Sequence, residues 1–211
     1  IGAPMMKDAT RRWSTQDANE LYEVKGWGKG YFSVSPEGNL LCHPEKDQSR
    51  SVDLKQLVDS MQLRGLDLPL LVRFNGILKD RIHEMHDVFA RAIADHKYEG
   101  RYSCVYPVKV NQQRHVVEKI VQYGREFGFG LEAGSKPELL AVMAMSENSP
   151  DRLIVCNGFK DDSYIETAML ATKLGRCIVP VVENFSELAL ILKHAQRLDV
   201  RPKIGVRVKL A

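Results

Sequence analysis

The second half of the chain alternates between short apolar stretches and amphipathic segments, and this alternation constrains the fold more than any other feature of the sequence. The apolar stretches start about 25 residues apart, which leaves room for one helix in each connection. They cover residues 104–110, 127–132, 153–157, 177–182 and 204–208. Because helical connections join parallel strands that are buried on both faces, the alternation predicts a parallel sheet covered by helices.

The connecting segments carry apolar residues at the 3.6-residue spacing of a helix face. These faces consist of Val116, Val117, Ile120 and Val121; Leu139, Leu140 and Met143; Ile165, Ala168 and Thr172; and Leu188, Ile191, Leu192, Ala195 and Leu198. A longer helix is predicted at residues 76–96, after a stretch at 68–74 that reads as a further strand. Successive strands without a glycine-rich dinucleotide turn fit half of a (β/α)8 barrel as well as a doubly wound sheet, so the pattern leaves this choice open.

The first part of the chain has a different character. Residues 31–34 and 40–42 are β-like and flank a turn, which predicts a β-hairpin. A polar linker follows, and then a short helix with one apolar face made of Leu54, Leu57, Val58 and Met61. We therefore expect residues 1–66 to form a separate amino-terminal segment and residues 67–211 to form the strand–helix domain. Because the chain begins at Ile1 and stops directly after a strand-like stretch, we also expect it to be a fragment.

Composition narrows the classes of partner. The 30 basic residues against 27 acidic ones leave a net charge of +3 without a dense basic run, which argues against nucleic acid. The apolar stretches are far shorter than the ~20 residues of a membrane-spanning helix, and the first residues lack the apolar region of a signal peptide. We expect a cytoplasmic protein without a membrane partner. No cysteine pair forms a C-x-x-C motif, so we expect reduced thiols, at least two of them buried in strands: Cys42, Cys104, Cys156 and Cys177.

Functional groups of a barrel lie at the carboxyl ends of its strands, where this sequence has Lys109, Asn111, Glu132, Asn157 and Arg207. Lys109 stands out because it lies inside an apolar strand pattern, where a charge is costly unless it is paired or used. A lysine in a partly desolvated site loses its proton more easily and can form a Schiff base. A structural ion pair with Glu132 explains the same pattern, and the spacing does not decide between the two interpretations.

Four blocks of the chain resemble the biosynthetic arginine decarboxylase family, in sequence and in order. They are residues 105–112, 130–139, 155–161 and 204–210. The resemblance extends through the amino-terminal part of the chain and so covers nearly all of it. The blocks around Lys109 and Glu132 are shared more loosely by ornithine and diaminopimelate decarboxylases, whereas the amino-terminal blocks favour arginine decarboxylases.

The resemblance implies an α/β fold in which residues 67–211 are the first part of a (β/α)8 TIM-type barrel that continues beyond Ala211, and residues 1–66 contribute to a β-domain. It implies decarboxylation of L-arginine to agmatine and CO2, in putrescine and spermidine biosynthesis, with pyridoxal 5'-phosphate as the cofactor. Magnesium is also associated with the family, although the sequence shows no magnesium cluster of its own. A homo-oligomer is implied, with a site completed by the rest of the chain and by a partner subunit, and we expect residues 1–211 alone to be inactive.

By resemblance, Lys109 is the lysine that carries the cofactor, and Glu132 matches an acid beside it, so both are expected to be catalytic. Glu138 matches a second acid near the cofactor, while residues 135–138 also have the pattern of a helix capping box; both roles can coexist. Asn157 matches a strand-end position near the cofactor, or is a turn residue. Arg207 matches an arginine close to the cofactor ring.

Two alternative functions stay open. One is a decarboxylase of the same fold that acts on ornithine, lysine or diaminopimelate, and the other is a non-catalytic relative that binds pyridoxal phosphate. The residues that would separate them, together with the phosphate-binding loop and the partner of the pyridine nitrogen, are expected beyond Ala211.

Overall fold

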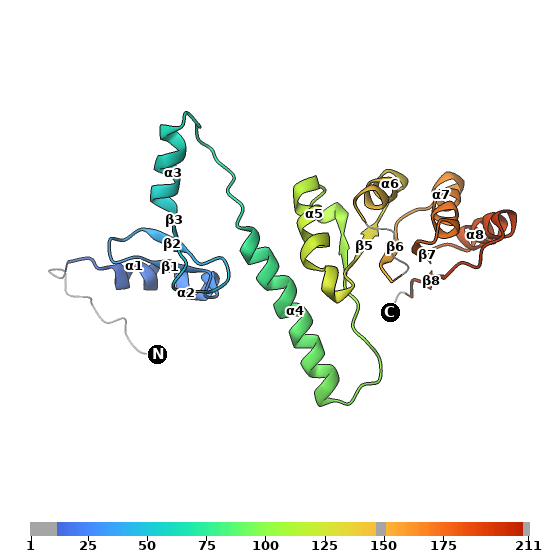
Figure 1. Cartoon of the computed structure of the whole chain (residues 1–211), viewed down its shortest axis with the longest axis horizontal. Coiled ribbons are helices and arrows are strands. Elements are labelled where there is room, and N and C mark those ends of the chain that lie inside the picture. Colours follow the sequence, from blue (N-terminus) through green and yellow to red (C-terminus); the bar gives the residue numbers. More distant parts are fainter. Residues whose placement is uncertain (1–11, 147–150, 209–211) are drawn as a thin grey trace, which may run out of the picture. The chain divides into compact units, whose positions relative to one another are not determined.

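The computed structural model describes residues 12–146 and 151–208. The chain divides into two compact units, Ile1–Asp80 and Arg81–Ala211, and the division falls inside helix α4 (Asn75–Asp95). Figure 1 shows the elements of both units. The boundary expected after residue 66 and the membership of the first segment in a β-domain remain predictions.

The first unit is built on an antiparallel sheet with the strand order β1-β2-β3. Its strands are β1 (Phe32–Val34), β2 (Leu40–Cys42) and β3 (Val52–Asp53), and its further helices are α1 (Thr15–Leu21), α2 (Val24–Gly28) and α3 (Leu54–Leu63). In the β1–β2 pair Phe32 lies opposite Cys42, which confirms the predicted hairpin. The Asp53 side chain accepts hydrogen bonds from the first backbone amides of α3 and so fixes where this predicted helix begins.

Residues 68–74 do not form the predicted strand. They are irregular chain between α3 and α4, and they pair with no strand within the described ranges. An apolar, β-like composition makes a strand only where a neighbouring backbone supplies hydrogen-bond partners, and Pro69 has no amide hydrogen to offer. The helix predicted at residues 76–96 is confirmed as α4.

The second unit holds a parallel sheet with the order β4-β5-β6-β7-β8. Its strands are β4 (Val105–Pro107), β5 (Gly130–Ala133), β6 (Leu153–Cys156), β7 (Cys177–Val182) and β8 (Gly205–Val206). Each crossover leads to the next strand in the same direction, whereas the strand order of a doubly wound sheet reverses partway. The sequential order therefore has the winding of a barrel, and this decides the choice that the sequence pattern left open.

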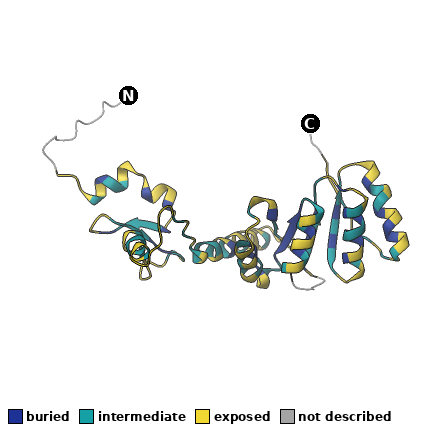
Figure 2. Ribbon diagram, turned by 90° about the horizontal axis from the view of Figure 1, so that it is seen from above, coloured by how far each residue is buried: buried dark blue, intermediate teal, exposed yellow. Residues whose placement is uncertain are grey.

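Four helices follow the strands in turn (Figure 1), with two 3-10 turns between them. They are α5 (Arg114–Tyr123), α6 (Lys136–Met145), α7 (Asp162–Lys173) and α8 (Phe185–Leu198), and the 3-10 turns are η1 (Val108–Val110) and η2 (Arg125–Phe127). Each helix contributes to one buried core with the strands, through Val117, Leu139, Ile165 and Ile191 among others. Figure 2 shows this buried layer on the strands and on the helix faces that cover them. Full burial of one such side chain stabilises the fold by about 1.5–3 kcal/mol, so the predicted apolar faces hold the helices on the sheet.

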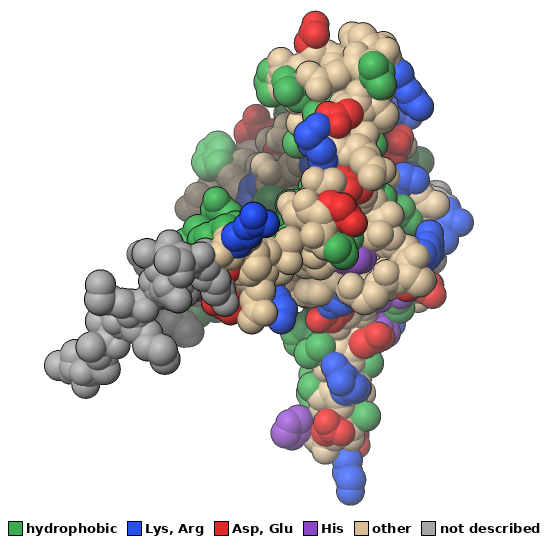
Figure 3. All heavy atoms as spheres, turned by 90° about the vertical axis from the view of Figure 1, so that its left-hand side faces the viewer, with side chains coloured by type: hydrophobic (Ala, Val, Ile, Leu, Met, Phe, Trp, Pro, Cys, Tyr) green, Lys and Arg blue, Asp and Glu red, His purple; other side chains and the backbone are tan. Residues whose placement is uncertain are grey.

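Acidic and basic side chains are interspersed on the face drawn in Figure 3. Within the described ranges, no helix combines the length and the apolarity that crossing a bilayer requires. All four cysteines are free thiols, and Cys42 in β2 and Cys156 in β6 are buried, as expected.

Candidate active site

Lys109 lies at the carboxyl end of β4, but not inside the strand. The ladder with β5 ends where Pro107 pairs with Glu132, and the chain then turns into η1. Val108 points into the core, whereas the Lys109 side chain is 59% exposed. The strand predicted at residues 104–110 thus ends at Pro107, two residues before Lys109.

Lys109 and Glu132 form an ion pair across the two neighbouring strands. The Lys109 Nζ atom lies 3.2 Å from the Glu132 Oε1 atom, and the side chain of Glu132 is only 4% exposed. Asn157, which directly follows β6, donates from Nδ2 to the same oxygen at 3.2 Å. The parallel register aligns the carboxyl ends of β4, β5 and β6, so three of the predicted site residues meet at one point.

The other carboxylate oxygen of this cluster is unpartnered. Glu132 Oε2 is buried and has no hydrogen-bond partner within the described part of the chain. A buried carboxylate oxygen without a partner costs free energy. It therefore marks capacity for a polar group that the described part of the chain does not provide.

Glu138 belongs to the neighbouring start of helix α6. Its amide donates to the Ser135 hydroxyl, so Ser135 is the helix cap, as the capping pattern predicts. The Glu138 carboxylate does not complete the box on the Ser135 amide. It accepts instead from the Gly134 amide at 2.6 Å and from Gln112 Nε2 at 2.7 Å. It thus ties the loop after β5 to the loop after η1.

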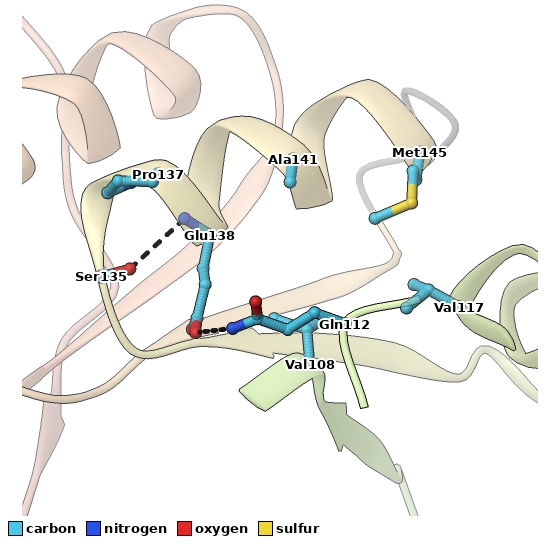
Figure 4. Close-up of a pocket in the computed structure, with 8 residues that line it drawn as sticks. All are labelled: Val108, Gln112, Val117, Ser135, Pro137, Glu138, Ala141 and Met145. Atoms are coloured by element: carbon cyan, nitrogen blue, oxygen red, sulfur yellow. Dashed lines mark hydrogen bonds between the residues drawn. The ribbon is translucent and has the colours of Figure 1, made fainter. Parts of the chain in front are cut away.

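Glu138 and Gln112 are among the residues that line a cavity of about 270 Å³ (Figure 4). Its apolar wall consists of Val108, Val117, Pro137, Ala141 and Met145. The same carboxylate is also close to the Lys109 cluster. A side chain at Gly134 would have its first carbon 3.3 Å from Glu138 Oε2 and 4.0 Å from Glu132 Oε1. Glycine keeps the space between the two carboxylates open.

Glu183, which follows β7, contacts both Arg207 and Gly158, the residue after Asn157. The Gly158 amide donates to Glu183 Oε1 at 3.0 Å, and Arg207 Nε lies 3.8 Å from the same oxygen. Asn157 donates a hydrogen bond to Glu132 and also precedes a turn, because the next residue, Gly158, has a φ of +74°. Arg207 is 56% exposed and is not brought to the Lys109–Glu132 pair.

Some residues of this region were not predicted from the sequence. Tyr164, on α7, donates its hydroxyl to the Ala133 carbonyl at 2.8 Å, and burial raises the pKa of Tyr164 far above its ordinary value. Burial also raises the pKa of the neighbouring Cys156 thiol to about 12. Glu183 could have been found by its place directly after β7, because the strand-end rule points there. Tyr164 lies on a helix and had no such signal.

No group of three or more His, Cys, Asp or Glu side chains within the described residues is arranged to hold a metal ion. The magnesium that the resemblance implies therefore remains a prediction, without a site assigned to it.

Comparison with known proteins identifies the family. Residues 79–211 match the family described as "Pyridoxal-dependent decarboxylase, pyridoxal binding domain". The chain belongs to this family. The matched range includes all five strands of the parallel sheet and every residue of the Lys109 cluster.

Among the decarboxylases to which the chain is similar, the biosynthetic arginine decarboxylase of Rhodopirellula baltica is 56% identical over 95% of this chain and 30% of that protein. That of Gloeobacter violaceus is 50% identical over 94% of this chain and 31% of that protein. The crystal structure of the biosynthetic arginine decarboxylase SpeA from Campylobacter jejuni superposes with a TM-score of 0.78 at 31% identity, over 90% of this chain and 31% of that chain. The chain thus spans about 30% of the length of the curated relatives it matches.

The strand-end residues of this decarboxylase domain fit a pyridoxal phosphate group. The Lys109 side chain is 59% exposed, the buried Glu132 Oε2 atom lacks a partner among the described residues, and glycine at 134 leaves open space between two carboxylates. Lys109 and Glu132 are therefore the residues that would hold the group, with Asn157 and Glu138 beside them.

Proposed function

We propose that the full-length protein decarboxylates L-arginine to agmatine and CO2 with pyridoxal phosphate held at Lys109, in putrescine and spermidine biosynthesis. The observation that carries the proposal is the contact between Lys109 Nζ and the buried Glu132 carboxylate within the pyridoxal-binding domain. Arginine as the substrate is supported by the names of the relatives at 50–56% identity.

When bound, pyridoxal phosphate supplies an electron sink for the charge left behind as CO2 departs. Lys109 would hold the group covalently through Nζ and release it when the amine of the substrate takes its place. The Glu132 carboxylate lies within hydrogen-bonding distance of Lys109 Nζ, so it would hold this nitrogen in place at the reacting centre. Asn157 keeps the Glu132 carboxylate in one orientation by donating to Oε1.

Glu138 and Arg207 have supporting roles in the proposal. Glu138 fixes the Gly134 backbone and Gln112, and so shapes the open space beside Glu132. Arg207 would approach the cofactor ring from β8, where Glu183 holds its guanidinium. Both assignments rest on the resemblance together with the placement of these residues at the carboxyl ends of the strands.

The proposal extends to the setting of the enzyme. We propose that the enzyme is a cytoplasmic homo-oligomer whose active site is completed by further residues and by a partner subunit. Neither nucleic acid nor a membrane is proposed as a partner. The net charge of +3 without a dense basic run supports the exclusion of nucleic acid. The antiparallel sheet β1-β2-β3 supports membership of the first unit in a β-domain. Magnesium enters the proposal by resemblance alone.

The test is amine formation by the purified full-length protein with pyridoxal phosphate, measured separately with arginine, ornithine, lysine and diaminopimelate. We expect agmatine from arginine at the highest kcat/KM and no product with Lys109→Ala. A higher kcat/KM with another of these amino acids would overturn the substrate assignment. Cofactor bound at Lys109 without any product would show a non-catalytic relative.

A further inference from the structure

Lys160 and Glu187 carry opposite charges and are completely buried. The Lys160 side chain, in the loop between β6 and α7, is 0% exposed, and that of Glu187, in the first turn of α8, is 1% exposed. Their Nζ and Oε2 atoms lie 3.1 Å apart. Moving two ions out of water is costly, and an apolar pair of similar volume is often as stabilising. Stability alone therefore does not account for this pair.

The remaining hydrogen-bonding capacity of both side chains is directed at the backbone of two loops. Glu187 accepts from the Lys160 amide at Oε1 (3.1 Å) and from the Glu183 amide at Oε2 (2.8 Å). Lys160 Nζ donates to the Gly158 carbonyl at 2.5 Å. An apolar pair could fill the same volume but could make none of these bonds. The pair thus ties the loop after β6 to the loop after β7.

The loop held in this way is the one that carries Asn157. Gly158 is fixed through its carbonyl by Lys160 and through its amide by Glu183 Oε1. On the other side, the Asn157 amide donates to the Ala133 carbonyl at 2.9 Å. The Asn157 side chain then reaches Glu132 Oε1, which also accepts from Lys109. A continuous series of contacts therefore leads from the buried pair to the Lys109 ammonium.

We propose that Lys160 and Glu187 are positioning residues, which hold the Asn157–Gly158 turn so that Asn157 keeps the Glu132 carboxylate directed at Lys109 Nζ. The inference rests on the proposed function in one respect, that Lys109 is the reactive lysine. Neither residue touches Lys109, so both act through Asn157.

The test uses the full-length, cofactor-loaded protein and the double variant Lys160→Met/Glu187→Gln, which removes both charges and keeps similar volumes. The matched control is Arg197→Met/Glu166→Leu, because this exposed ion pair also joins α7 and α8 but lies away from the loops. With the double variant we expect kcat for arginine to fall by about 10- to 100-fold, with a smaller change in KM. The control keeps wild-type kcat.

Two further readouts distinguish positioning from general structural support. The absorbance spectrum of the bound cofactor is expected to change, because a displaced Glu132 alters the charge distribution beside Lys109. In cofactor-free protein, the Gly158 amide is expected to exchange its hydrogen ~10-fold faster, while the amides of α7 and α8 stay protected. If the double variant does not fold, Glu187→Gln alone, which keeps the side-chain shape, is measured with the same expected directions.

A thermodynamic cycle with Asn157→Ala tests the route of the effect. If the pair acts through Asn157, the Asn157→Ala substitution lowers kcat by a much smaller factor in the double variant than in the wild type. Fully additive losses of kcat would overturn the inference. So would a double variant whose kcat, cofactor absorbance spectrum and Gly158 exchange rate all equal those of the wild type. A full-length protein that fails to decarboxylate arginine would refute the proposed function. Because hydrogen exchange at Gly158 does not depend on catalysis, it would still test whether Lys160 and Glu187 hold the turn.

Discussion

The Lys109 Nζ atom lies 3.2 Å from the Glu132 Oε1 atom, although the two residues are 23 positions apart in the sequence. Pairing of Pro107 with Glu132 in adjacent parallel strands produces this contact, because it brings the residues that follow β4 beside the end of β5. The two partners differ in environment, since the Lys109 side chain is largely exposed and the Glu132 side chain is buried. Substitutions of the two residues are therefore expected to have different consequences.

The first prediction concerns covalent attachment. Borohydride reduction of the full-length protein with pyridoxal phosphate is expected to label Lys109, as found by peptide mapping, and Lys109→Ala to abolish turnover. The fold is expected to persist because the exposed side chain contributes no contact to the core. Lys136→Ala, at the start of α6, serves as the control and keeps both the label and the turnover. A label on a different lysine would refute the assignment.

The second prediction separates the two carboxylates. Glu132→Ala is expected to lower kcat by about 100-fold or more, because it removes the charge beside Lys109. Glu138→Ala is expected to lower kcat less and to reduce the free energy of unfolding by about 0.5–1.5 kcal/mol for each hydrogen bond that its carboxylate makes, to the Gly134 amide and to Gln112. Paired melting and rate measurements compare them. Equal rate losses without a stability change would contradict a mainly structural role of the Glu138 carboxylate in the loop after β5.

The third prediction is a pH dependence of stability. Burial raises the pKa of Glu187, but hydrogen bonds from the Glu183 amide and from Lys160 lower it more, so its pKa lies below the ordinary value. A carboxyl whose pKa is lower in the folded state adds stability that is present above its unfolded pKa of about 4.3 and is lost as the pH falls through the folded value.

Lys160→Met/Glu187→Gln removes this titrating group. We therefore expect the free energy of unfolding to fall less steeply for the variant than for the wild type between about pH 5 and pH 3, measured by denaturant titration at each pH. Parallel curves for the two proteins over this range would exclude a lowered pKa at Glu187.

The fourth prediction tests the turn after Asn157. Gly158 has a φ of +74°, and a side chain there would have its first carbon 2.4 Å from the Gly134 carbonyl oxygen. Gly158→Ala is expected to destabilise the protein by about 1–3 kcal/mol through backbone strain, and by more through the clash. Gly175→Ala is the matched control, because Gly175 has a φ of +85° with no atom within 4 Å of such a carbon. Similar losses for both variants, measured by denaturant unfolding, would show that the clash is relieved.

The fifth prediction concerns the thiols. Burial raises the pKa of Cys42 and raises that of Cys156 to about 12, whereas Cys104 and Cys177 are partly exposed. Because the thiolate is the reacting form, iodoacetamide at pH 8 is expected to modify Cys104 and Cys177 well before the other two. Mass spectrometry of the native protein measures the order. Early modification of Cys156 would show that β6 opens locally.

Local periodicity was enough to predict most elements of the second unit. Helices α5 to α8 and strands β5, β6 and β7 form where apolar residues recur at the corresponding spacing, because side-chain direction along a helix or a strand is set by backbone geometry within a few residues. The resemblance to arginine decarboxylases singled out Lys109, Glu132 and Asn157, and the structure places these three together. Their roles remain proposals.

The remaining features depended on partners distant in the sequence, which no local pattern specifies. The stretch at residues 68–74 lacks a pairing strand in the described ranges, β4 ends before Lys109, and the Glu138 carboxylate binds the Gly134 amide and not that of Ser135. The choice of a barrel over a doubly wound sheet came from the order of the strands. The Lys160–Glu187 ion pair could not be predicted from the sequence for the same reason. Only the packing of α8 beside the loop after β6 buries both side chains and brings their charged groups together. Hydrogen-bond partners and burial are properties of the assembled layers, so they were decided by the tertiary structure alone.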